Sequence, residues 1–403
     1  MPKKGNQHAL ANARLIGINT QPTQAATLER MTQSPPVHPR VLIAGNASAL
    51  KSGASLTAQV DTMPHRKVIR SWLEPIVRKN TAYAVFLVVA DLLLFAAAIS
   101  ATVLLDSPFL QMLAAVFGGL VIGRLFILGH DACHQSFTRH RRLNRWLGRL
   151  VFMPSLTPYS LWDVGHNVVH HGYTNLKDFD FVWQPYSLEA YQCLPAWRKV
   201  LEKVYRSGWA PWLYYGVEIW WKRMYFPSKA LMPTVRSIFT ADCLLVTGVA
   251  AVWTGALVTA AFATGQSVLW LLLVAFVLPL LVWKALIGFV VYVHHTHTRV
   301  AWYDNKKAWS AASPFVSTTV HLKFGAGMGA ALHHIMEHTA HHVDMSVPLY
   351  RLQKAQALLE EKLPGKIIIQ RFSWAWYFQT ARRCKLYDFE RACWTDFSGR
   401  RTS

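Results

Sequence analysis

The stretch that decides the fold is YAVFLVVADLLLFAAAISATVLL, residues 83–105, in which Asp91 is the only charged residue. Three similar apolar stretches follow, at about residues 109–129, 238–264 and 268–293. Each contains roughly 20 or more mostly apolar residues, the length that a helix needs to cross a hydrocarbon core about 30 Å thick. The sequence therefore predicts an integral membrane protein with four transmembrane helices.

The composition and charge of the chain argue against a soluble nucleic-acid binder. Hydrophobic residues make up 52% of the sequence and charged residues only 16%, yet the formal net charge is +21. The basic residues stand beside the apolar stretches, where the cytoplasmic loops of membrane proteins carry them. We therefore expect no nucleic-acid partner. The five cysteines form no CxxC pair, and we expect reduced thiols.

Four charged residues lie within the apolar stretches: Asp91, Arg124, Asp242 and Lys284. Arg124 and Asp242 stand near the expected cytoplasmic ends, where a charged side chain can reach the headgroups. Asp91 and Lys284 lie deeper. Because an unpaired charge in hydrocarbon is costly, we expect these two residues to pair with each other.

The connections between the stretches predict the topology. Residues 106–108 and 265–266 are short turns with almost no charge, so each joins two helices into a hairpin. The long segments rich in Lys and Arg belong in the cytoplasm by the positive-inside rule. The predicted fold is all-α, with four transmembrane helices in two hairpins and a helical cytoplasmic cap formed by residues 130–237 and 294–403. Both termini are then cytoplasmic, in a bacterial inner membrane or an organelle membrane.

Three segments complete the expected organisation. Residues 1–70 are rich in Gln, Asn, Ser, Thr and Pro, with scattered basic residues, and we expect a disordered basic tail. Residues 75–403 contain no internal linker and are expected to form one membrane domain. Within this domain, Arg139–Arg149 alternates Arg with Leu and Trp at helical spacing and should lie at the headgroup level.

Most of the 18 histidines gather in four short groups. The groups are His130 and His134; His166, His170 and His171; His294, His295 and His297; and His333, His334, His338, His341 and His342. Residues three or four apart lie on one face of a helix, so neighbouring histidines of a group should point their rings in one direction. The predicted topology places all four groups on the same side of the membrane. We expect the remaining histidines, His8, His38, His65, His140 and His321, to be ordinary polar residues.

The number of histidines indicates two metal ions in the cap. One zinc ion needs three or four protein ligands, whereas two ions with four or five ligands each match the number of imidazoles. Imidazole binds Zn, Cu, Fe and Ni alike, so spacing does not choose the element. We expect the nearby carboxylates to orient the rings. These carboxylates are Asp131, Asp163, Glu337 and Asp344.

The combined pattern HxxxH, HxxxHH and HxxHH resembles the membrane fatty-acid desaturases and their hydroxylase relatives, over about residues 80–360. His294-His-Thr-His297 and His338-Thr-Ala-His-His342 are similar to segments of the acyl-lipid branch. Two features depart from the usual pattern. Three residues separate His166 from His170 where desaturases have two, a spacing that also resembles alkane hydroxylases. His294 and Thr298 replace the family's Gln and Pro, which leaves the ligand of this group open.

The resemblance implies a fatty-acid desaturase, with a di-iron centre that uses O2 and introduces a double bond into the acyl chain of a membrane lipid. Carried over by position, the implied iron ligands are His130, His134, His166, His170, His171, His295, His338, His341 and His342, with His297, His333 and His334 in reserve. The chain shows no heme motif, ferredoxin cysteine set or dinucleotide loop, so electrons should come from a separate ferredoxin-like or other acidic carrier. The basic cap also suits anionic lipid headgroups. Candidate lining residues of an acyl channel are Tyr159, Trp162, Phe179 and Trp183.

Three other functions stay open at this point. A di-iron hydroxylase or ketolase of a lipid, alkane or carotenoid would use the same ligands. A membrane zinc hydrolase would need His-Glu-x-x-His, and His130-Asp131 supplies only an imperfect version. A metal transporter would place histidines and acids within the spans, whereas here they crowd one side.

Overall fold

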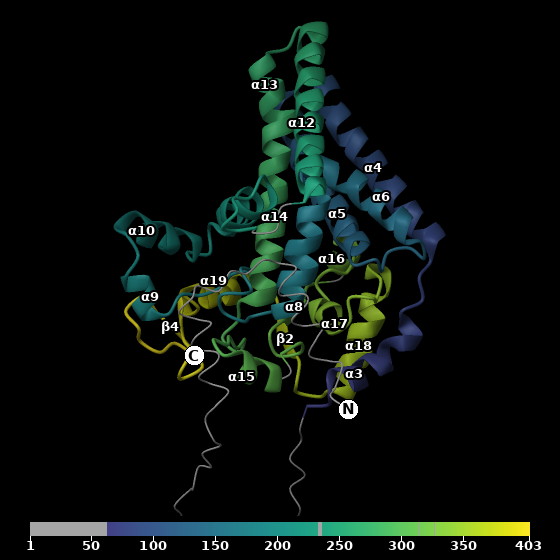
Figure 1. Ribbon diagram of the computed structural model, residues 1–403. Helices are drawn as coiled ribbons and strands as arrows, with labels where there is room; N and C mark the ends of the chain where they lie inside the picture. Colours follow the sequence, from purple (N-terminus) through teal and green to yellow (C-terminus); the bar gives the residue numbers. More distant parts are fainter. Residues whose placement is uncertain (1–62, 233–235, 313, 326) are drawn as a thin grey trace, which may run out of the picture. The chain divides into compact units, whose positions relative to one another are not determined.

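The computed structural model describes residues 63–232, 236–312, 314–325 and 327–403 (Figure 1). All elements below belong to the compact unit formed by Pro64–Leu231 and Arg236–Ser403. Most of the predicted tail, residues 1–62, lies outside the described residues. Its last part differs from the prediction, because Arg66–Leu73 forms helix α3. The Arg66 and Arg70 guanidiniums donate to the carbonyls of His342 and Val343, which gives this segment fixed partners.

Four helices of the described chain are long and apolar enough to cross a membrane, as predicted. They are α4 (Thr81–Leu104), α5 (Pro108–Cys133), α12 (Ser237–Thr264) and the continuous helix Val268–His295. The last comprises α13 (Val268–Leu272), the π-helical turn η5 (Leu273–Val277) and α14 (Leu278–His295). Their outer faces expose large apolar side chains such as Phe262 and Leu269, which suits contact with lipid.

Helix α5 packs directly against α14 through two glycines. A Cβ atom at Gly119 would lie 2.5 Å from Cβ of Val282, and one at Gly123 would lie 2.4 Å from Cδ2 of Leu286. At Gly119 a Cβ atom would also lie 2.7 Å from the backbone oxygen of Pro279, so only glycine permits the close approach there, whereas at Gly123 the Leu286 side chain can move. As a result, the histidines at the ends of α5 and α14 lie in the same part of the molecule.

The charged residues of the spans pair differently from the prediction. Asp91 contacts Arg124 and His333 instead of Lys284. The reason is the packing of α4 against α5, which brings Arg124 beside Asp91. The Lys284 ammonium lies 4.5 Å from the centre of the Trp220 ring.

The remaining elements are short. The helices are η1 (Glu74–Ile76), α6 (Arg141–Phe152), η2 (Met153–Ser155), α7 (Tyr159–Trp162), η3 (Asp163–His170), α8 (His171–Tyr173), α9 (Leu188–Gln192), α10 (Ala196–Tyr205), α11 (Pro211–Tyr214), η4 (Tyr215–Met224), α15 (Lys306–Ala311), α16 (Met328–Ala331), α17 (His338–Val343), η6 (Leu349–Arg351), α18 (Leu352–Lys362) and α19 (Trp374–Arg383). The strands are β1 (Val320–Lys323), β2 (Ile368–Arg371), β3 (Leu386–Asp388) and β4 (Cys393–Thr395). The prediction of an all-α fold is thus wrong in a small part.

The strands form two small two-stranded sheets. Strands β1 and β2 are parallel, with Val320 opposite Ile368, and β3 and β4 are antiparallel. Val320 and Ile368 belong to a buried cluster that also contains Trp302, Tyr387 and Trp394. The sheets and this buried cluster therefore hold the C-terminal segment against the segments that follow α14. The five cysteines are free thiols, as expected.

Candidate metal centre

Nine histidine side chains converge in two groups, and they are the nine proposed from the sequence. The first group contains His130, His134, His166, His171 and His341, and the second contains His170, His295, His338 and His342. Within each group, one potential ligand atom from every residue lies within 4.8 Å of all the others. Figure 1 shows the helices α8 and α17 near the lower ends of α5 and α14, where the groups meet.

The last turns of α5 supply the first two rings of the first group. His130 and His134 are four residues apart, and their Nε2 atoms lie 3.4 Å from each other. This is the pairing that an α-helix predicts. The Nε2 atom of His130 also lies 2.7 Å from that of His166.

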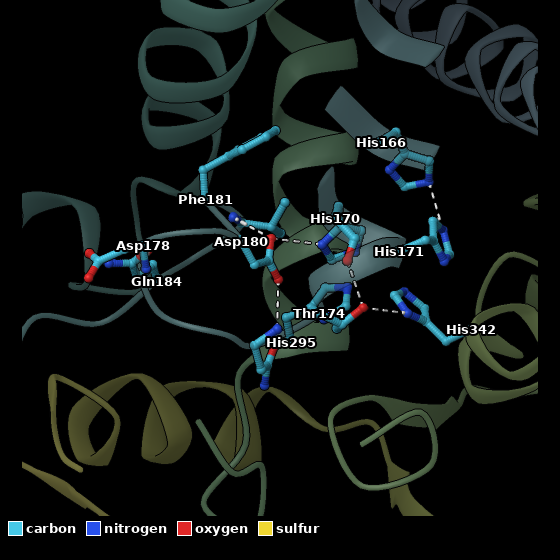
Figure 2. Close-up of polar contacts among 12 residues, drawn as sticks. His166, His170, His171, Thr174, Asp178, Asp180, Phe181, Gln184, His295 and His342 are labelled. Carbon is cyan, nitrogen blue, oxygen red and sulfur yellow. Dashed lines mark hydrogen bonds and ion pairs between the residues drawn. The ribbon is translucent and has the colours of Figure 1, made fainter. Parts of the chain in front are cut away.

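The segment His166–His171 divides its rings between the groups because it follows a π-helix. Residues Asp163–His170 form η3, in which positions five apart share a face. The Nε2 atoms of His166 and His171 accordingly lie 3.1 Å apart, and His170 turns into the second group (Figure 2). The expected pairing of His166 with His170 is therefore wrong. The wider turn accommodates the extra residue by which this motif departs from the usual desaturase spacing.

Helix α17 also contributes to both groups. His338 and His342 are four residues apart, with Nε2 atoms 3.0 Å from each other, and both belong to the second group. His341 points to the first group, where its Nε2 atom lies 3.1 Å from that of His171. The expectation that all three rings face one direction is wrong, because His341 stands on a different face of the helix.

His295, at the end of α14, is the member of its segment that joins a group. Its Nε2 atom lies 3.0 Å from that of His338. His294 stacks on His338 with ring centres 3.9 Å apart, and its Nε2 atom contacts Sδ of Met336. The reserve ligands lie outside both groups. His297 contacts the backbone of Arg299, His333 contacts Asp91, and His334 contacts Glu337.

The rings are buried and held in the neutral form that metal binding requires. Burial, followed by the neighbouring rings, lowers the pKa of His134, His166 and His171 well below the usual value of an imidazole. The same causes act on three rings of α17. They lower the pKa values of His338, His341 and His342. A neutral imidazole keeps a free lone pair, which is the form that binds a metal ion.

The spacing of the ring nitrogens fits metal ions. Two nitrogens bound to one ion at about 2.0–2.1 Å stand roughly 3.0–3.4 Å apart in tetrahedral or octahedral geometry. The Nε2 atoms of His171 and His341 and those of His295 and His338 are separated by 3.1 and 3.0 Å. The Nε2 atom of a neutral imidazole carries either one proton or one lone pair, so Nε2 of His166 cannot make ordinary hydrogen bonds to both His130 and His171. Purely nitrogen ligands suit Fe, Zn or Cu.

One carboxylate orients a ring of the site, and it is not among those predicted. Nδ1 of His170 lies 2.9 Å from Oδ1 of Asp180, and this carboxylate also accepts from the backbone N–H groups of Asn175 and Val182 (Figure 2). This contact leaves Nε2 of His170 for a metal. No periodic pattern pointed to Asp180, because a loop brings it back to η3. Thr174 contacts Nδ1 of His342 in a similar way.

The four predicted carboxylates hold other groups instead. Asp131 accepts from Ser136 and from the backbone N–H of Leu349. Asp163 accepts from Asn167, Glu337 contacts His334, and Asp344 lies beside Arg70 and Ser346. None of them contacts a ring of the two groups within the described residues, so their expected role is wrong.

A narrow apolar cavity opens onto both groups. Its lining includes His130 and His166 of the first group and His170, His295 and His338 of the second. Its other walls are mainly apolar and include Phe126, Trp162, Phe181, Tyr215, Ile219, Met224, Ile287 and Ile335. Of the four aromatic residues expected here, Trp162 lines the cavity. Tyr159, Phe179 and Trp183 lie elsewhere, because their rings pack against other parts of the fold.

Comparison with known proteins agrees with this site. Residues 106–374 match the family model described as fatty acid desaturase. An sn-1 oleoyl-lipid 12-desaturase of Arthrospira platensis is 30% identical over 268 residues, which cover 66% of this chain and 73% of the relative. An enzyme of the same name from Synechocystis sp. is 28% identical and covers 68% and 75% of the two chains.

A third relative carries an electron donor in its name. The sn-1 acyl-lipid omega-3 desaturase (ferredoxin) of Synechocystis sp. is 31% identical, over 62% of this chain and 67% of its own length. The family match covers more than half of the chain and spans all nine histidines of the two groups. This chain therefore belongs to the fatty acid desaturase family and is an oxidoreductase of lipid metabolism.

Proposed function

We propose that the chain introduces a double bond into the acyl chain of a membrane lipid, using O2 and two iron ions. The observation that supports this most strongly is the position of two histidine groups on one apolar cavity. Each group has the ligand number of one metal ion. The names of the relatives make an sn-1 oleoyl lipid the first substrate to test.

Iron bound by the two groups would supply the activation of O2 and the power to remove hydrogen from a methylene. The protein's own contribution is position. Neutral imidazoles hold the ions, and Asp180 fixes the ring of His170. The histidines on the cavity wall set the distance between the ions and the acyl chain.

The apolar wall of the cavity suits a hydrocarbon and excludes water from it. Phe126, Phe181 and Ile287 present only carbon atoms to the cavity. A methylene has no polar atom by which to be oriented, so the shape of this wall decides which carbon faces the histidines. That shape also decides between removal of a second hydrogen and addition of oxygen.

We further propose that residues 75–403 form one domain of two transmembrane hairpins with a cytoplasmic cap. The positions of His130 and His295 at the ends of two apolar helices support a site just outside the hydrocarbon. The basic segments beside the spans support cytoplasmic termini and a cytoplasmic site. A bacterial inner membrane or an organelle membrane fits this arrangement.

Two electrons per turnover come, in this proposal, from a separate ferredoxin-like carrier. The net charge of +21 attracts an acidic protein, and one relative is named for its use of ferredoxin. The same charge attracts anionic lipid headgroups.

The test is expression of the full chain in a host without desaturases, followed by mass spectrometry of the membrane lipids. We expect acyl chains that have lost two hydrogens, with the double bond at one position. Acyl chains that gain oxygen instead would favour the hydroxylase alternative. Unchanged lipids in a host that supplies ferredoxin and contains the iron-loaded protein would contradict the proposal.

A further inference from the structure

Asp91, Arg124 and His333 form a buried cluster that lies outside both histidine groups. Oδ1 of Asp91 accepts from Nη2 and Nε of Arg124, at 2.7 and 3.0 Å. Oδ2 of Asp91 lies 2.6 Å from Nε2 of His333. Asp91 is 1% exposed and His333 4% exposed. These three residues are called the latch below.

The latch connects two transmembrane helices to the turn that precedes α17. Asp91 belongs to α4 and Arg124 to α5, whereas His333 lies between α16 and α17. Nη1 of Arg124 also donates to the carbonyl of Ala331, so the latch holds this turn at two points. A carboxylate buried within a span requires such partners, because an unpaired charge there is costly.

The turn has a backbone conformation that its residues rarely adopt without fixed contacts. His333 and His334 have φ angles of 48° and 59°, in the left-handed region that favours glycine. Two consecutive residues with side chains in this region indicate a turn whose shape is imposed by its surroundings. Backbone hydrogen bonds within the turn hold part of this shape, and the latch contacts add side-chain partners at His333 and Ala331.

Two residues that follow His334 contact the cavity and a ring beside the metal-binding groups. Ile335 lines the cavity. Sδ of Met336 lies 3.2 Å from Nε2 of His294, which stacks on His338. The latch is thus two residues from the cavity wall and five residues from His338, yet it contacts neither the cavity nor a ring of the two groups.

We propose that the latch sets the position at which the acyl chain is oxidised, by fixing Ile335 in the cavity wall and Met336 against His294, which also lines the cavity. Asp91, Arg124 and His333 are then positioning residues of the desaturation proposed above, on which this inference rests. Displacement of the cavity wall by a fraction of an ångström changes which methylene faces the histidines. Loss of the latch therefore changes where the double bond forms, whereas loss of stability alone would change only how much product forms.

The test compares two neighbouring substitutions in the same turn. His333→Ala removes the latch, and His334→Ala places the same residue at the same kind of backbone position without touching Asp91 or Arg124. Both full-length variants are expressed in the desaturase-lacking host, and the position of the double bond is determined by mass spectrometry. We expect about a tenfold rise in minor positional isomers for His333→Ala and none for His334→Ala.

Two further variants keep the proposal testable. His333→Gln retains a donor toward Asp91 and should restore the wild-type position. Arg124→Lys keeps the charge but cannot contact both Asp91 and the Ala331 carbonyl. It should therefore also increase the share of minor positional isomers, and it provides a test even if His333→Ala does not accumulate. An unchanged position in Arg124→Lys, or an equal spread in His334→Ala, would overturn the proposal.

A second measurement separates this inference from the proposed function. If the wild-type chain forms no double bond at all, the proposed function is wrong. The latch is then tested by measuring hydrogen exchange of the backbone amides of residues 331–338 in the purified protein. Faster exchange in His333→Ala than in His334→Ala would support a latch that holds the cavity wall. Equal exchange in the two variants would overturn it.

Discussion

The two histidine groups differ in size and in what orients their rings. The first has five rings and the second has four. In the described part of the chain, no ring of the first group contacts a carboxylate, whereas His170 of the second group is fixed by Asp180. The first group is therefore organised by the packing of rings from α5, the segment η3–α8 and α17, and the second depends more on polar contacts, those of Asp180 with His170 and of Thr174 with His342. This difference indicates that the two metal positions can be disturbed separately.

Adjacent residues supply different groups. His170 and His171 diverge at the end of η3, and His341 and His342 diverge on α17. Two short segments thus hold both groups at a fixed separation. One substitution should remove a ring from one group and leave the other group intact.

The largest effect is expected from His341→Ala and His342→Ala. Each variant loses a ligand of one group, so the iron content should fall from about two to about one per chain, and turnover should be abolished. Metal analysis and lipid profiling of the purified variants measure the two effects. His140→Ala, a histidine exposed on the surface, is the control and should retain both irons and activity. Full activity of either variant would remove that ring from the site.

A smaller effect is expected from Asp180→Asn. This change weakens the contact that orients His170, and losses of an orienting partner lower activity or metal affinity by about 10- to 100-fold. Asp178→Asn is the matched control, because Asp178 lies two residues away and is exposed (Figure 2). Iron titration of both variants checks the prediction. Equal affinity in the two would show that the second group does not depend on Asp180.

Deletion of Val168 should have a smaller effect than Asp180→Asn, although Val168 lies between two histidines of the site. The π-helix η3 pairs His166 with His171, five residues apart, and removal of one residue brings this pair to the α-helical spacing of four. Val168 is 38% exposed, so few contacts are lost. We expect both irons to be retained and activity to fall less than about tenfold. Loss of iron from the deletion variant would mean that the wider turn is required.

The last and smallest expected effect is on the stability of the iron-free protein and not on activity at neutral pH. Burial lowers the pKa values of six rings outside the spans, and four of these rings, His134, His166, His171 and His341, belong to the first group. The unfolded chain, with pKa values near 6.5, binds more protons than the folded chain as the pH falls below that value. The free energy of unfolding is therefore highest above about pH 6.5 and decreases on acidification.

Thermal unfolding of the iron-free protein at two pH values checks this expectation. The midpoint should be at least about 5 °C lower at about pH 5.5 than at about pH 7.5. Substitution of His134 by Gln should reduce the difference, because one titrating ring is lost. A midpoint independent of pH would contradict the neutral state of the rings.

Much of the fold and the site could be predicted from the sequence. The predictions that failed concern features that regular helical periodicity does not report. Length and apolarity are enough to locate the spans. Spacing gathers the histidines into four groups, and the family resemblance selects the nine that converge. Helical periodicity could not predict that His166 and His170 separate, since a π-helix changes the repeat from four residues to five. It also could not predict Asp180 or the pairing of Asp91 with Arg124 and His333, because these contacts depend on how loops and helices pack.

The most direct test of the two groups is anomalous diffraction at the iron absorption edge from crystals of the purified full chain. We expect two iron positions, one among His130, His134, His166, His171 and His341 and the other among His170, His295, His338 and His342. A single metal position, or zinc in a fully active protein, would contradict it.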